Sequence, residues 1–185
     1  ILVRGLKKED VLKLKEIISE YYGGNEFYSS YSCIGSTTCN VGILDTPPIL
    51  DYIFEFFDND EKRNLTNYLP QIRIAGCPNS CATPQIARLG FSGRRKKDGE
   101  YFAIFARGKF DDKVVKLNEI IGEIKATKIP YFLEDIANII KAENIEFEQL
   151  VNEDRFIELI EKYKEFELEA IDFNDFRKAD AKRAW

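Results

Sequence analysis

Apolar positions recur at helical spacing in several stretches of the chain. Between residues 6 and 24 they lie three or four positions apart, and Gly23-Gly24 provides a stop. The stretch 47–58 begins with two prolines, which suit the first turn of a helix, and its apolar side chains fall on one side. Beyond residue 112 the chain is predicted to be mainly helical, with helices over residues 113–125, 130–142 and 152–166.

Other stretches follow the two-residue period of strands. Residues 71–76 alternate between apolar and polar positions, and residues 87–93 and 101–108 flank a basic turn that ends in Asp98-Gly99. These two segments pair naturally as a hairpin, whereas residues 25–38, rich in Ser, Tyr and Thr, are predicted to form a loop. The predicted fold class is therefore α+β, with a mixed or antiparallel β-sheet and helices packed on it.

The nearest feature to a domain boundary is the turn around residues 143–152. We expect a first domain over residues 1–150 and a C-terminal helical arm over residues 151–185, where a charged sequence carries periodic Phe, Ile and Leu. The chain opens directly on a strand-like stretch and contains no methionine. We therefore expect the first domain to be truncated at its N-terminus.

Composition and charge narrow the possible classes of protein. The chain has 185 residues, of which 44% are hydrophobic, enough for one well-filled core. Its net charge of −5 argues against a nucleic-acid partner, because phosphate binding depends on clustered Lys and Arg. The strongest apolar run, residues 49–57, contains Asp51 and Glu55 and is far shorter than the roughly 20 residues of a membrane span, so we expect no membrane partner.

The chain contains no histidine. This excludes Ser-His-Asp and Cys-His catalysis, and histidine-based zinc or copper sites, within the chain itself. Catalysis by side chains alone is therefore disfavoured, and the four cysteines become the candidates for chemistry.

The cysteines occur as two close pairs, C-x5-C and C-x3-C, separated by 37 residues: Cys33, Cys39, Cys77 and Cys81. Each pair lies in a stretch of turn-forming residues, where small side chains let backbone N–H groups approach and hydrogen-bond sulfur. Four thiolates in two pairs suit a cubane iron–sulfur cluster. A structural zinc site, two disulfides and four independent buried cysteines remain as alternatives, although neither pair has the C-x2-C spacing of a zinc knuckle.

The stretches CIGSTTCNVGILD and RIAGCPNSCATPQIARLGFSG closely resemble the cluster-binding half of the nitrite and sulfite reductase haemoprotein family. The likeness depends on the four cysteines, their order and both spacings, together with Gly76, Pro78, Asn79 and Gly90. It extends from about Ile1 to the helices near residue 142.

This resemblance implies that Cys33, Cys39, Cys77 and Cys81 are the metal ligands of one 4Fe-4S cluster. It also implies that Cys81 is the catalytic cysteine, because its thiolate also bridges to the iron of sirohaem. The implied activity is the six-electron reduction of nitrite to ammonia or of sulfite to sulfide. The implied partners are nitrite or sulfite, an electron donor protein or subunit, and a missing homologous half or second subunit.

Some expectations around this centre leave more than one interpretation open. Asn79 lies inside the cluster loop, where its amide can reach a sulfur or the haem or can satisfy its own backbone. Four arginines are candidates for sirohaem carboxylates or are ordinary surface charges: Arg73, Arg88, Arg94 and Arg107.

Two further predictions concern the location of the protein in the cell and an alternative function. Reduced thiolates and the lack of a visible secretory signal predict a cytoplasmic location. The alternative function is an electron-transfer module that holds a 4Fe-4S cluster without sirohaem or catalysis.

Overall fold

A five-stranded mixed sheet forms the centre of the fold. The computed structural model describes residues 4–17, 25–110, 113–165, 168, 171–173 and 176. The sheet has the order β1-β2-β3-β4-β7; β1, β2 and β3 run parallel, and β4 pairs antiparallel with both β3 and β7. Its strands are β1 (Tyr31–Ser32), β2 (Ile72–Ala75), β3 (Leu89–Lys96), β4 (Gly99–Ala106) and β7 (Glu119–Lys125). A separate ribbon pairs β5 (Lys109–Phe110) with β6 (Val115–Lys116).

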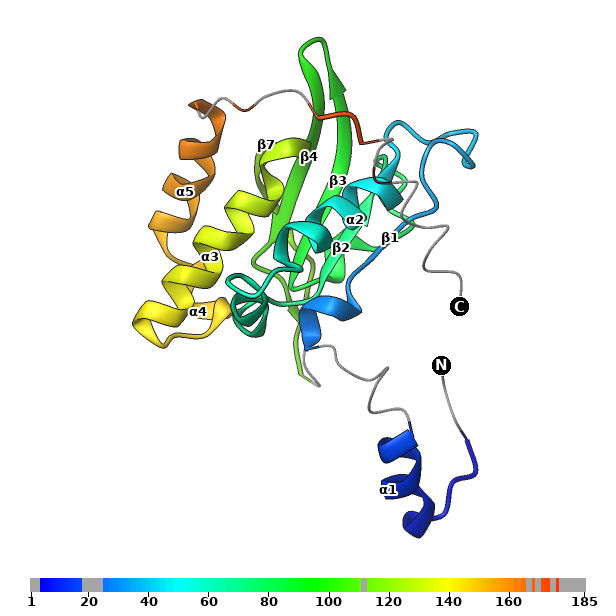
Figure 1. Cartoon of the computed structure of the whole chain (residues 1–185). Coiled ribbons are helices and arrows are strands. Elements are labelled where there is room, and N and C mark those ends of the chain that lie inside the picture. The colour runs from blue at the N-terminus through cyan, green and yellow to red at the C-terminus, as the bar shows by residue number, and fades with distance from the viewer. Residues whose placement is uncertain are drawn as a thin grey trace.

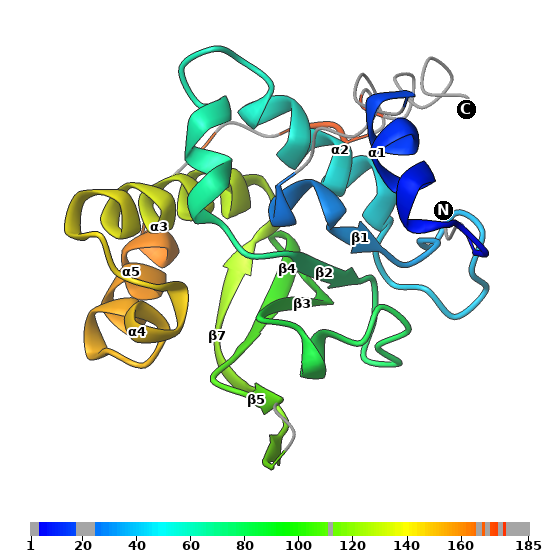
Figure 2. The ribbon, with the colours of Figure 1, turned by 90° about the horizontal axis from the view of Figure 1, so that it is seen from below.

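Helices cover one face of this sheet. The α-helices are α1 (Lys8–Ile17), α2 (Thr46–Phe57), α3 (Ile129–Glu143), α4 (Phe147–Val151) and α5 (Asp154–Glu165). Short 3-10 turns are η1 (Glu26–Ser29), η2 (Arg63–Tyr68), η3 (Pro84–Ile86) and η4 (Ala126–Lys128). Helices α2 and α3 cross the same face of the sheet (Figures 1 and 2), and α5 packs beside α3 and β7. None of the described helices is long and apolar enough to cross a membrane.

The core lies between the sheet and its helices. Alternate strand residues such as Ile74, Phe91 and Phe102 point to the helical side, because successive side chains of a strand point to opposite faces. They meet fully buried side chains of α2 and α3, including Ile53 and Phe132. The apolar run at residues 49–57 is therefore a core helix.

The mixed sheet with packed helices confirms the predicted α+β class. The predicted helix at 47–58 corresponds to α2, and those at 130–142 and 152–166 correspond to α3 and α5. The hairpin is also confirmed, since β3 and β4 pair from Gly90 with Phe105 to Lys96 with Gly99. Helix α1 confirms the first predicted helix over its described part, whereas residues 18–24 lie outside the described residues.

Two local predictions are wrong. Residues 113–125 were predicted to be helical, but they form β6 and β7. The strand wins because β7 pairs with β4, with Phe102 opposite Ile124, and completes the sheet next to α5. The loop predicted over residues 25–38 contains η1 and the short edge strand β1, which gains its partner only from β2, about 40 residues away along the chain.

The side chains of α5 belong to the same hydrophobic cluster as the rest of the fold. Phe156 and Ile160 are fully buried and Tyr163 is nearly so. The division of the chain at residue 150 stays a prediction, and most of the predicted C-terminal arm beyond residue 165 lies outside the described residues.

Candidate metal centre

The two cysteine pairs begin at one edge of the sheet. Strands β1 and β2 are parallel neighbours, so their carboxyl ends lie side by side. Cys33 follows β1 directly, and its N–H continues the ladder by donating to the Ile74 carbonyl at 2.9 Å. Cys77 follows β2 after Gly76. The parallel pairing therefore brings together two pairs that are far apart in sequence.

The loop after Cys33 turns back toward β2. Gly35 has a φ of 80°, and its carbonyl accepts the N–H of Cys39 at 2.9 Å. Farther along, the Leu44 N–H donates to the Gly76 carbonyl at 3.0 Å. A Cβ at Gly76 would lie 2.4 Å from the Leu44 carbonyl oxygen, so only glycine allows this close approach. The loop therefore presents Cys39 beside the end of β2.

The second loop holds Cys81 between two residues in left-handed conformations. Ser80 has a φ of 58° and Thr83 a φ of 51°, which are uncommon for residues other than glycine. Gln85 donates its amide N–H to Ser80 Oγ at 2.6 Å, and Arg73 donates to Thr83 Oγ1 at 2.9 Å. These hydrogen bonds help to hold a strained loop whose central cysteine is exposed.

All four cysteines line one cavity of about 240 Å³. Cys77 is buried, Cys33 and Cys39 are partly buried, and Cys81 is exposed; all four are free thiols. Asn79 also lines this cavity, together with Ile34, Gly35, Val41, Gly42, Ala75 and Gly76. The structure thus brings together every residue that the sequence singled out for the metal centre, and the disulfide alternative has no pair in this structure.

The donor set of this cavity is four thiols. Zinc holds sulfur at about 2.3 Å, which places its ligand sulfurs only about 3.8 Å apart. Among the described residues, no three His, Cys, Asp or Glu side chains are placed to hold a single metal ion. Four thiols are the ligand set of both a 4Fe-4S cluster and a structural zinc, so the donor chemistry of this cavity fits either group.

Two groups approach the sulfur of Cys33. The backbone N–H of Gly76 donates to Sγ at 3.1 Å. This is the N–H to sulfur hydrogen bond that the glycines and small residues of the cysteine turns predict. The Oγ1 of Thr46 lies 3.3 Å from the same sulfur and donates to the Cys33 carbonyl at 2.9 Å. The sequence analysis did not find Thr46, because the first residue of a helix carries no local signal for contact with a residue 13 positions earlier.

The four candidate arginines do not form one cluster. Arg73 contacts the Cys81 loop through Thr83, whereas Arg88 pairs with Glu26 and Glu148. The hydrogen bonds that Arg88 donates to the Glu148 carboxylate raise the pKa of the Arg88 guanidinium above its ordinary value. The other two bind elsewhere: Arg94 lies 3.7 Å from the Glu123 carboxylate, and Arg107 donates to the Val151 carbonyl.

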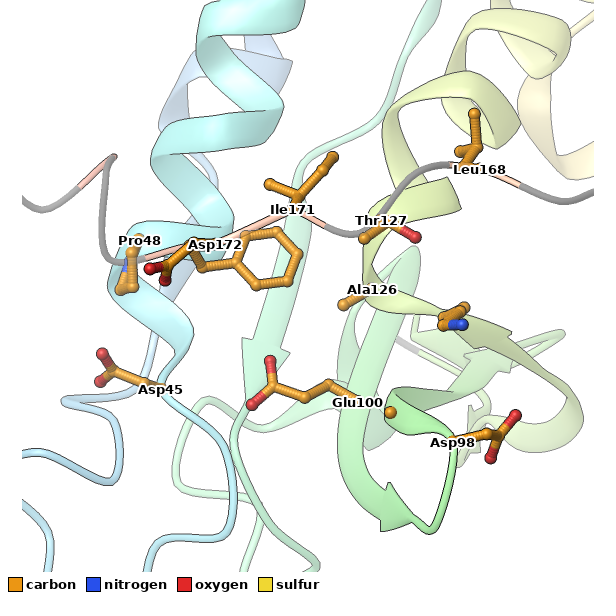
Figure 3. A pocket seen from close by; sticks show the side chains of 12 residues that line it. Asp45, Pro48, Asp98, Glu100, Ala126, Thr127, Leu168, Ile171 and Asp172 are labelled. Atoms are coloured by element: carbon orange, nitrogen blue, oxygen red, sulfur yellow. The ribbon is translucent and has the colours of Figure 1, made fainter.

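A second cavity, of about 330 Å³, lies beside the N-terminal end of α2 (Figure 3). Four carboxylates and one lysine are among its lining residues: Asp45, Asp98, Glu100, Asp172 and Lys125. Such a lining repels anions, so this cavity does not suit an anionic substrate.

Comparisons with known proteins identify the family of this chain. The family model "Nitrite and sulphite reductase 4Fe-4S domain" matches residues 23–164, which include both cysteine loops, helices α2 to α4, and α5 up to Lys164. The chain belongs to this family. Its membership confirms the resemblance that the two cysteine motifs indicated.

Individual relatives carry related names. The sulfite reductase (NADPH) hemoprotein beta-component of Afipia carboxidovorans is 27% identical over 132 residues, covering 66% of this chain and 22% of that protein. The protein of the same name from Nitrosomonas europaea is 32% identical over 97 residues, covering 51% of the chain and 17% of the relative. The sulfite reductase (NADPH) subunit beta of Saccharomyces cerevisiae is 27% identical over 147 residues, 72% of the chain and 10% of the relative.

A solved structure shares the fold. The NirA protein of Mycobacterium tuberculosis superposes with a TM-score of 0.58 at 20% identity, over 82% of this chain and 31% of that one. The chain itself spans about a fifth or less of the length of the three sulfite reductase relatives named above.

Proposed function

We propose that Cys33, Cys39, Cys77 and Cys81 hold one 4Fe-4S cluster. The observation that carries this proposal is the single cavity that all four cysteines line at the carboxyl ends of β1 and β2. The family description, which names a 4Fe-4S domain, supports the same assignment. Thiolates are the usual ligands of such clusters, and the Gly76 N–H supplies a hydrogen bond to the Cys33 sulfur of the kind that adjusts a cluster's potential.

The Cys81 thiolate is proposed to bind the iron of sirohaem as well. Cys81 is the exposed member of the set, so a large macrocycle can reach its sulfur from outside the domain, whereas Cys77 is buried. When bound, the two coupled groups supply the electrons for reduction of an anion. The residues of this chain hold and orient these groups: the strained loop positions Cys81, and Asn79, which lines the cavity, is proposed to contact the cofactor.

The proposed reaction is the six-electron reduction of nitrite to ammonia or of sulfite to sulfide. The names of the relatives support a sulfite or nitrite reductase, and the beta-component and subunit names support a partner that donates electrons. Because the chain spans 22% of the Afipia relative, we assign the groups that bind the anion to a homologous half or second subunit. The cytoplasmic location remains part of this proposal.

Anaerobic purification followed by an absorption spectrum and iron and acid-labile sulfide analysis tests the assignment. We expect sirohaem bands with about five irons and four sulfides per chain. Cys77→Ser should lose iron and sulfide together, and Cys81→Ser should in addition lose the sirohaem bands. About four irons without sirohaem would favour the electron-transfer module, whereas about one zinc and no iron would refute the cluster.

A further inference from the structure

Thr46 connects the start of α2 to the candidate metal centre. It is the first residue of that helix, and its side chain is fully buried. Its hydroxyl faces Cys33, with Oγ1 2.9 Å from the carbonyl oxygen and 3.3 Å from Sγ. A buried hydroxyl needs a partner, and both of these partners belong to one cysteine.

The hydroxyl has one hydrogen and two possible acceptors. While Cys33 is a thiol, its S–H can donate to Thr46 Oγ1, and the hydroxyl hydrogen can go to the Cys33 carbonyl. A thiolate bound to metal has no hydrogen to donate and can only accept. The contact at 3.3 Å is then favourable only if the threonine hydroxyl shares its hydrogen with the sulfur.

We propose that Thr46 is a positioning residue that raises the reduction potential of the metal centre by donating a hydrogen bond to the Cys33 thiolate. The inference rests on the proposed 4Fe-4S cluster. Reduction adds one electron to the cluster, and part of that charge falls on the thiolate sulfurs. A donor beside one of them stabilises the reduced form more than the oxidised form, which makes the potential less negative.

Cys33 is the cysteine whose sulfur receives the hydrogen bonds that would shift the reduction potential. Among the described residues, the hydrogen bonds to cysteine sulfur come from Gly76 at 3.1 Å and from Thr46, and both reach Cys33. The Gly76 donor is backbone and no substitution removes it cleanly. The Thr46 donor is a side chain and can be removed by itself.

The test is a reductive titration with dithionite of anaerobically purified protein, followed by electron paramagnetic resonance of the reduced cluster. Thr46→Val keeps the side-chain volume and removes the hydroxyl. We expect about a tenfold loss in the equilibrium constant for reduction, which is about 59 mV more negative for a one-electron couple. Thr46→Ser keeps the hydroxyl and should keep the wild-type potential.

Thr66→Val is the matched control. Thr66 is also a buried threonine, but it donates to the Arg63 carbonyl in η2, outside the cavity. This variant should lose stability without any shift in potential. If Thr46→Val does not retain iron, Thr46→Ala is titrated in its place, with the same negative shift expected.

Two results overturn the inference: a wild-type potential in a cluster-loaded variant without the Thr46 hydroxyl, or loss of the cluster from both such variants while Thr46→Ser keeps it. The second result would make Thr46 a structural requirement of the site. Failure of the proposed function looks different, since the wild-type protein itself would then contain no iron, no sulfide and no signal to titrate.

Discussion

Gly76→Ala is expected to destabilise the protein and to disrupt the metal centre. An alanine Cβ would lie 2.4 Å from the Leu44 carbonyl oxygen, so the two segments must separate by about 1 Å to reach ordinary contact. That shift stretches the Leu44 N–H bond to the Gly76 carbonyl, now 3.0 Å, and the Gly76 N–H bond to Cys33 Sγ, now 3.1 Å. Overpacking of about 1–3 kcal/mol and about 1 kcal/mol for the weakened hydrogen bond between Leu44 and Gly76 together give about 2–4 kcal/mol, with the bond to sulfur left out of the sum.

Thermal unfolding of the reduced, metal-free protein measures this loss. For a chain of this length each kcal/mol lowers Tm by roughly 2–4 °C, so we expect a decrease of roughly 4–16 °C, with lower iron content after anaerobic reconstitution. Gly122→Ala is the matched control, because its Cβ would meet the buried Ile160 side chain on α5 at 2.7 Å, and neither residue lines the cysteine cavity. The control should retain full iron content. A Gly76→Ala variant with unchanged Tm and iron content would refute the reasoning.

Three further predictions concern the rest of the fold. Phe132→Ala in the core of α3 should lower the unfolding free energy in urea by about 3–5 kcal/mol, and Leu12→Ala on exposed α1 by less than about 0.5 kcal/mol; similar losses would contradict the assigned burial. Asn144 has a φ of 51° at the end of α3, so Asn144→Gly should keep the unfolding free energy, whereas Asn144→Ala should lower it by about 1 kcal/mol in the same assay. Equal stability of the two variants would count against the left-handed cap. Burial raises the pKa of the Glu148 carboxyl, but the hydrogen bonds and charge of Arg88 outweigh it and hold that pKa below its usual value of 4.5. The stability that this pair contributes is therefore complete above pH 4.5 and is lost as the pH falls through the lower pKa of the folded protein. Arg88→Ala should flatten the acid side of the curve of unfolding free energy against pH. An unchanged slope would contradict the pairing.

Elements with a strong local pattern were predictable from the sequence. The prolines and one-sided apolar residues of α2, and the alternation on either side of Asp98-Gly99, each determine a structure over a dozen or so neighbouring residues. Residues 113–125 show the limit of this approach. Their apolar spacing is compatible with a helix, and only pairing with β4 made residues 119–125 a strand.

The metal centre divides in the same way. The two cysteine motifs and Asn79 could be found in the sequence because their spacing and turn residues are local. Thr46 and the specific role of Gly76 could not, since their contacts with Cys33 join positions 13 and 43 residues apart. Such contacts depend on how the chain returns to the same edge of the sheet.

By itself, then, the sequence determined the fold class, most helices and the hairpin, and the four sulfur-bearing residues with their order and spacing. Only the tertiary structure decided that both pairs meet at the carboxyl ends of β1 and β2, that Cys81 is exposed while Cys77 is buried, and that Thr46 lies against Cys33. The physical reason is the range of the interactions. Helical spacing and turn chemistry act between near neighbours, whereas parallel strand pairing and close backbone approach at Gly76 join segments that no local pattern connects.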